Sequence, residues 1–141
     1  MTEEYQTEGR AAECLTLYHM HLMNLDVYLP SLDRTGPDMI ILFQTSVALL
    51  QIKHQNSTKK NKDHINSQWD LDRRFDYILY WLHDFSRAYL FPRGKLNSNG
   101  FFVSNPEIEQ YLIDPGNFKS CFERIIFSDK ETIQIPTNAS S

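Results

Sequence analysis

The chain has 141 residues and a hydrophobic fraction of 41%, so it is long enough to bury a core without cross-links and too apolar to be disordered throughout. Its formal net charge of −4 argues against a protein that binds nucleic acid by overall charge, although a local basic patch is compatible with that total. The polar start, MTEEYQTEGR, is unlike a secretory signal, and the longest uncharged run, residues 39–52, is too short to span a bilayer.

A first helix is predicted over residues 8–29, with Thr7 as its N-cap and Pro30 as its stop. At helical spacing, one apolar stripe of this segment consists of Ala11, Cys14, Leu15, Tyr18, Leu22, Leu25 and Leu29. A second apolar strip consists of Met20, Met23 and Val27. A helix that is apolar on two sides is expected to lie between neighbours or to share one side with a partner.

A second helix is predicted from residues 35–37 to His54, because T-G-P-D offers a cap, a fixed φ and an early carboxylate. Its apolar residues cover nearly the whole circumference, which places it at the centre of the fold. Frequent β-branched residues leave a strand over residues 39–43 as the alternative. Residues 55–67 form a polar loop with three lysines, Lys59, Lys60 and Lys62, which we interpret as a solvated loop.

A third helix is predicted over residues 68–91, since Ser67 and Asp70 have capping-box spacing and Pro92 ends the segment. One face of it is apolar and is assigned to the core. The opposite side carries a stripe of rings and charges, namely Arg73, Tyr77, Tyr80, Asp84 and Arg87, flanked by Trp69, Asp76 and Phe91. Such residues are enriched at protein–protein interfaces, so the stripe predicts a partner surface. The alternative is that it packs beneath the C-terminal segment of the same chain.

The C-terminal part mixes turns with short elements. Asn99-Gly100 followed by residues 101–103 predicts a small hairpin. Asn105-Pro106 opens a short helix to about Ile113, and Asn117 caps a last helix over residues 118–127. Residues 133–135 are a candidate edge strand before the chain frays.

No catalytic or metal-binding signature stands out in the sequence. The five histidines lack the spacing of a shared metal site, and no phosphate-binding glycine motif or nucleophile elbow is present. Cys14 and Cys121 lie among apolar residues and are interpreted as buried free thiols rather than a disulfide. We therefore predict no cofactor and no metal site.

Together these patterns predict a mainly α fold: three long helices in a bundle, with a small C-terminal β-hairpin and two short helices. One helical domain is expected over residues 1–135 and a frayed tail over 136–141, in the cytoplasm or nucleus.

The predicted function is a non-enzymatic interaction module, a small subunit or adaptor of a larger assembly or a homodimer. Its partner is expected to be another protein chain or a second copy, rather than nucleic acid or a membrane. The predicted partner-binding residues are Trp69, Arg73, Tyr77, Tyr80, Asp84 and Arg87. The alternative is a protein that binds single-stranded nucleic acid through a basic and aromatic patch, made of Arg87, Arg93, Lys95 and Phe101.

Overall fold

The computed structural model describes the backbone of residues 3–30, 36–43 and 46–138, and the side chains of residues 9–30, 36–42 and 46–129. It is a mixed α/β fold built on a six-stranded sheet with the order β1-β2-β3-β5-β6-β8, so the prediction of a three-helix bundle is wrong. The strands are β1 (Asp26–Tyr28), β2 (Met39–Phe43), β3 (Ser46–His54), β5 (Tyr77–Trp81), β6 (Ala88–Pro92) and β8 (Leu112–Ile113). Strands β3 and β5 pair in parallel, and the other neighbours pair antiparallel.

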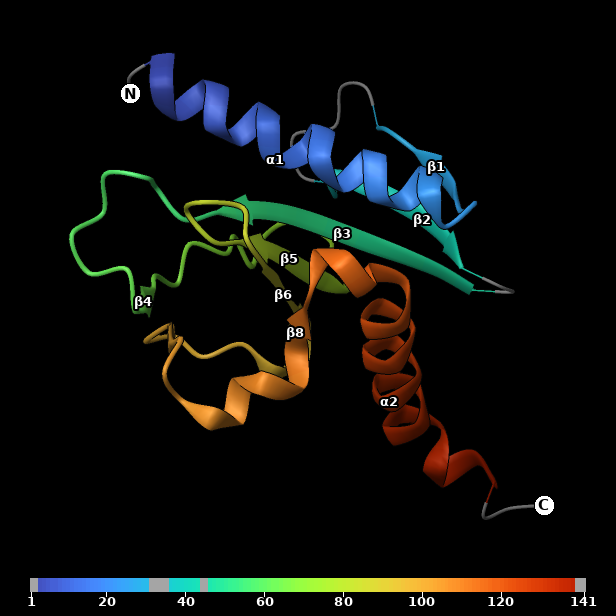
Figure 1. Cartoon of the computed structure of the whole chain (residues 1–141). Helices are drawn as coiled ribbons and strands as arrows, with labels where there is room; N and C mark the ends of the chain where they lie inside the picture. The colour runs from blue at the N-terminus through green and yellow to red at the C-terminus, as the bar shows by residue number, and fades with distance from the viewer. Residues whose placement is uncertain (1–2, 31–35, 44–45, 139–141) are drawn as a thin grey trace.

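Two long helices and a small second sheet complete the fold. Helix α1 (Glu3–Leu22) lies along β1, β2 and β3, and α2 (Phe118–Asn138) begins near β8 and runs away from the sheet (Figure 1). Strands β4 (His64–Ile65) and β7 (Phe101–Phe102) pair on the other side of the sheet. The 3-10 turns are η1 (Arg93–Lys95), η2 (Pro106–Tyr111) and η3 (Pro115–Asn117). In the described part of the chain, neither helix has an apolar stretch that could cross a membrane.

The core consists of two clusters, one on each face of the sheet. Both helices pack on the first face, where Trp81 and Phe122 are fully buried. The second face is covered by the segments around β4, β7 and η2, and its centre is the fully buried Phe91. Because both faces are covered, all residues of β5 and β6 are buried.

This double burial explains the wrong helix predictions. A strand that is covered on both faces is a continuous apolar run, and periodicity alone does not separate it from a buried helix. The run predicted as the second helix is the β2–β3 hairpin, and the strand alternative for residues 39–43 is confirmed. The predicted cap Thr35 lies outside the described residues.

The segment predicted as the third helix is a loop followed by the β5–β6 hairpin. The turn of this hairpin contains no glycine or proline. Instead, the Asp84 carboxylate accepts hydrogen bonds from the Ser86 amide and hydroxyl, and Phe85 has a φ of 58°. Aspartate-centred turns of this kind are common, but the surrounding run of rings concealed this one.

The first predicted helix is present but begins earlier, at Glu3, so Thr7 lies inside it and is not its N-cap, and a different side of it faces the core. It ends at Leu22, Asn24 has a left-handed φ of 57°, and β1 follows. The buried side of α1 carries Thr16 and Met20, whereas Tyr18 and Leu22 of the predicted core stripe are more than half exposed. The second apolar strip is therefore the inner one.

The C-terminal predictions are correct in part. Helix α2 starts at Phe118 as predicted but continues to Asn138, so residues 133–135 are helical and part of the expected tail is ordered. The short helix after Asn105 is confirmed as the 3-10 segment η2, with the Asn105 side chain capping Glu107. The Asn99-Gly100 turn is present, but β7 then pairs with the distant β4 instead of forming a local hairpin.

Candidate active site

At the N-terminal end of β2, the side chain of Asp38 continues the hydrogen bonding between β2 and β3. The Asp38 amide donates to the Leu50 carbonyl at 2.8 Å, and the Ile52 amide donates to Asp38 Oδ2 at 2.8 Å. The carboxylate thus takes the position that the next carbonyl of β2 would occupy in the ladder. The last strand pair between β2 and β3 is Met39 with Leu50, so the rest of β3 pairs only with β5 in the described chain. An edge of β3 is left open at this point.

Two polar residues of β3 lie next to this edge. Gln51 and Lys53 are two apart and therefore project from the same face of the strand. Gln51 is fully buried, and its Oε1 accepts from the Asp70 amide at 3.3 Å, but its Nε2 has no hydrogen-bond partner among the residues that the structure describes. A buried donor without a partner costs about 1–3 kcal/mol, so this atom is expected to serve a ligand. Lys53 is half-buried and pairs with no carboxylate among the described side chains.

Helix α1 supplies a second carboxylate. Glu13 and Asp38 line one pocket of about 130 Å³, whose other walls are Cys14, Leu17, Leu29 and Met39. Partial burial raises the pKa of Glu13, and repulsion from Asp38 raises it further, whereas Arg73 and Arg10 act in the opposite direction. Glu13, Asp38, Gln51 and Lys53 are called the edge site below.

The raised pKa of Glu13 predicts how the stability of the fold depends on pH. The folded state holds the Glu13 proton more tightly than the unfolded chain, so ionisation costs stability once the pH exceeds the ordinary glutamate pKa of about 4.3. In chelated buffer we expect Glu13→Gln to raise the melting temperature slightly at about pH 7 and to change it little near pH 3, where glutamate is protonated in both states. The exposed Glu109→Gln is the control. A lower melting temperature of Glu13→Gln at neutral pH would contradict the inference that ionised Glu13 destabilises the folded state.

The predicted partner-binding residues do not share one face. Trp69, Tyr77 and Tyr80 are buried, at 8%, 3% and 0% exposure. Tyr77 donates its hydroxyl to Asp129 at 2.8 Å, and burial followed by this contact raises its pKa. Arg73 lies in the loop before β5, whereas Asp84 and Arg87 lie in the β5–β6 turn, because the segment that was expected to align them as a helix is a loop followed by a hairpin.

The residues of the predicted nucleic-acid patch are also separated. Arg87 precedes β6, whereas Arg93 and Lys95 follow it in η1, so they lie at opposite ends of the strand. The Phe101 ring stacks on Phe91 at 4.5 Å, so this face of the ring is used within the core. The guanidinium of Arg93 lies 4.4 Å from the Phe75 ring centroid and is likewise engaged inside the protein.

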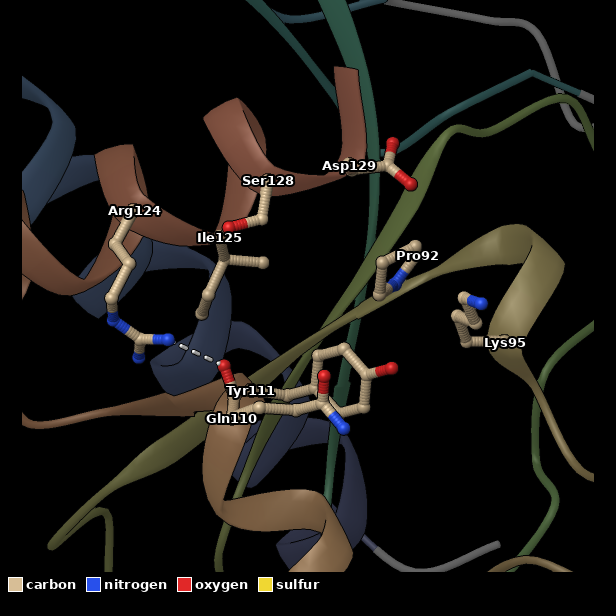
Figure 2. A pocket seen from close by; sticks show the side chains of 8 residues that line it. All are labelled: Pro92, Lys95, Gln110, Tyr111, Arg124, Ile125, Ser128 and Asp129. Carbon is tan, nitrogen blue, oxygen red and sulfur yellow. Dashed lines mark hydrogen bonds between the residues drawn. The ribbon is translucent and has the colours of Figure 1, made fainter. Parts of the chain in front are cut away.

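A larger pocket of about 250 Å³ lies between α2 and the segment before β8 (Figure 2). Its two cations, Arg124 and Lys95, lie on opposite sides, and Arg124 donates to the Gln110 carbonyl at 2.9 Å. Its carboxylate, Asp129, accepts from Tyr77. These polar groups do not converge on a common point, so the edge site is the better candidate for chemistry.

The sequence predictions missed all four residues of the edge site. Gln51 and Lys53 carry a signal, since they are polar residues at strand spacing at the end of an apolar run. In the predicted helix these two residues lie on different sides, so the strand pattern was not recognised. Glu13 has no comparable signal, because a glutamate on a helix surface is ordinary. Of the described side chains that could bind metal, no three His, Cys, Asp or Glu cluster together.

Comparisons with known proteins give one informative likeness. No protein-family model matches the sequence, and no curated protein matches it. Among solved structures, the fold is similar to that of a bacterial homing endonuclease, I-Ssp6803I, with a TM-score of 0.63 and 17% identity over 88% of this chain and 94% of that one.

This likeness overturns the functional predictions made from the sequence. The fold is not a helical bundle, and the similar structure is an endonuclease, so the expectation of a non-enzymatic helical adaptor finds no support. The same likeness counts against the expectation that nucleic acid is not a partner. The alternative of a nucleic-acid-binding protein agrees better with the fold.

Proposed function

We propose that this chain is an endonuclease that hydrolyses phosphodiester bonds of DNA at the edge site. The observation that carries the proposal is the convergence of two carboxylates, from Glu13 on α1 and Asp38 before β2, in one pocket. Strand β3 adds a lysine and a buried amide donor, Gln51 Nε2, for which the described part of the chain offers no partner. The fold likeness to a homing endonuclease supports this assignment.

Each residue of the edge site has a role that fits phosphoryl transfer. In hydrolysis, the oxygen of water bonds to phosphorus, the bond to the leaving oxygen breaks, and the leaving oxygen takes up a proton. Negative charge spreads over the phosphoryl oxygens during this step. The Lys53 ammonium stabilises that charge, and Gln51 Nε2 donates to a phosphate oxygen. Asp38 and Glu13 are acceptors that orient the attacking water.

The carboxylate pair also fits a Mg²⁺ ion. Proteins that act on phosphates hold this ion by one or two carboxylates, waters and the phosphate itself. Glu13 and Asp38 provide that number of carboxylates, and repulsion from Asp38 adds to the effect of burial in raising the pKa of Glu13. When bound, such a cation would neutralise charge on the phosphate oxygens.

The chemistry of the edge site favours DNA over RNA. Cleavage of RNA can use the 2′-hydroxyl of the substrate as the nucleophile, with histidines as acid and base. The residues that line the Glu13–Asp38 pocket include no histidine. Two carboxylates, with a lysine on the neighbouring strand β3, instead suit the attack of water, which needs no 2′-hydroxyl.

The experiment is cleavage of a supercoiled plasmid library with random inserts, in Mg²⁺, followed by sequencing of the new ends. We expect wild-type protein to produce ends and Asp38→Asn to lower their yield by about 100-fold or more, because the carboxylate is lost at the reacting centre. The melting temperature of the variant shows whether it is folded. Chelation of Mg²⁺ should stop cleavage by the wild type.

Single-stranded DNA and RNA form parallel arms of the assay. Cleavage of RNA alone would assign the site to the other nucleic acid, and cleavage by Asp38→Asn at the wild-type rate would place the chemistry elsewhere. If the wild-type protein cut none of the three, the proposed function would be wrong.

A further inference from the structure

Arg73 joins two segments beside the edge site. Its Nε and Nη2 atoms both donate to the Gly36 carbonyl, at 2.9 and 2.7 Å. Its Nη2 also donates to Asp38 Oδ1 at 2.9 Å, in an ion pair whose side chains are 19% and 18% exposed. The other oxygen of Asp38 is held by the Ile52 amide. Both carboxylate oxygens therefore have a fixed donor.

The loop that carries Arg73 is itself fastened at its centre. Arg93 donates from Nη1 to the Arg73 carbonyl at 2.7 Å and from Nη2 to the Leu71 carbonyl. The same guanidinium lies over the Phe75 ring, at 4.4 Å from its centroid. The backbone of Arg73 is thus held by a second arginine, from η1.

Both ends of this loop are fastened to β3. At the start, the Asp70 amide donates to Gln51 Oε1. At the end, Asp76 exchanges two bonds with Leu49: its amide donates to the Leu49 carbonyl at 2.8 Å, and its Oδ2 accepts from the Leu49 amide at 2.9 Å. A loop that is fixed at both ends and in the middle gives Arg73 a rigid base.

We infer that Arg73 is a positioning residue of the nuclease site, which orients the Asp38 carboxylate between its own guanidinium and the Ile52 amide. This inference rests on the proposed function. The planar guanidinium spans the Gly36 carbonyl and the Asp38 carboxylate at the same time, which the point charge of a lysine cannot reproduce. Precise orientation matters because a displacement of about 1 Å at a reacting group can cost about 100-fold in rate.

The charge of Arg73 has a second effect on the pair of carboxylates. Glu13 and Asp38 repel each other across their pocket, and Arg73 opposes this repulsion. Arg73 therefore keeps the two carboxylates together in the absence of a bound cation. Lysine at this position would retain the charge and lose the fork, whereas glutamine would lose both, so the two variants separate geometry from charge.

The test compares Arg73→Lys and Arg73→Gln with the wild type, and Arg74→Lys serves as the matched control on the adjacent, exposed arginine. The probe is the supercoiled plasmid library with Mg²⁺, under single-turnover conditions with saturating protein. We expect both Arg73 variants to cleave about 10- to 100-fold more slowly, with the protein concentration for half-maximal rate changed less than about threefold. Arg74→Lys should keep the wild-type rate.

A second measurement does not depend on cleavage. Hydrogen exchange of the Ile52 amide reports its bond to Asp38 Oδ2. We expect the Ile52 amide to exchange at least about tenfold faster in both Arg73 variants and at the wild-type rate in Arg74→Lys. The amide of Leu79, in the central strand β5, should exchange at the wild-type rate in all variants.

The outcomes separate this inference from the proposed function. If the wild type cleaves and both Arg73 variants cleave at the wild-type rate, Arg73 is not a positioning residue, and the nuclease assignment stands. The same conclusion follows if the Ile52 amide of the variants exchanges at the wild-type rate. If Arg73→Lys is fully active and Arg73→Gln is not, the charge of Arg73 matters and its forked geometry does not, which contradicts the inference. Loss of folding in both variants would make the role purely structural. Without wild-type cleavage the proposed function fails, and the exchange of Ile52 still decides whether Arg73 holds Asp38.

Discussion

Lys53→Met is expected to lower the cleavage rate by about 100- to 1000-fold, the loss seen when one preorganised donor to a developing negative charge is removed. Methionine approximates the unbranched apolar stem of lysine and lacks the ammonium. Lys53 lies beside Tyr80 in the parallel pair of β3 and β5, so the backbone at this position is fixed by strands on a buried sheet. Single-turnover cleavage of the plasmid library, with the melting temperature as a check on folding, measures the effect.

The control for Lys53 is another lysine that loses the same charge. Lys60 is exposed in the polar loop between β3 and β4, so Lys60→Met should change the rate by less than about threefold at saturating protein. Equal losses in the two variants would mean that overall charge, and not a lysine at the edge site, determines cleavage. Unimpaired cleavage by Lys53→Met would remove Lys53 from the mechanism.

Phe91→Ala is expected to lower the free energy of unfolding by about 3–5 kcal/mol, the range for truncation of a large buried ring. Phe91 is fully buried in β6, and its ring lies 4.5 Å from Phe101, 5.7 Å from Tyr111 and 5.8 Å from Tyr89. Removal of the ring leaves a cavity at the centre of the second cluster. Urea unfolding followed by tryptophan fluorescence measures the loss.

Phe102 provides a matched control for Phe91. It is the same residue type, is 51% exposed in β7, and contacts the His64 ring at 5.0 Å. Phe102→Ala should cost less than about 1 kcal/mol, because half of the ring is already in water. Similar losses for the two phenylalanines would contradict the arrangement in which β6 is covered on both faces.

Some elements follow from local sequence alone. The 3-10 segment after Asn105 and the start of α2 at Phe118 have local signals, and the structure has them there. The turn at Asn99-Gly100 is also local, since Gly100 adopts a φ of 78° and an added Cβ would lie 2.1 Å from the Ile65 carbonyl oxygen. Caps and turns depend on a few consecutive residues, so the sequence predicts them directly.

The central strands do not follow from local sequence. The segments of β2, β5 and β6 are apolar on both sides, which is the pattern of a buried helix as much as of a buried strand. Length would have distinguished them only if the turn at Asp84 had been recognised. These segments are strands because they hydrogen-bond to segments distant in the chain: β3 pairs with β5 across a long loop, and β6 pairs with β8.

The sequence by itself determined the size of the core, some caps and turns of the C-terminal part, and the residue types available for chemistry. Only the tertiary structure decided where that chemistry lies. Glu13, Asp38 and Lys53 are unremarkable in sequence, and they form a candidate site because α1 packs against β1 and β3 and because the Asp38 carboxylate completes the ladder at Ile52. Contacts of this kind join residues far apart along the chain, and no local pattern encodes them.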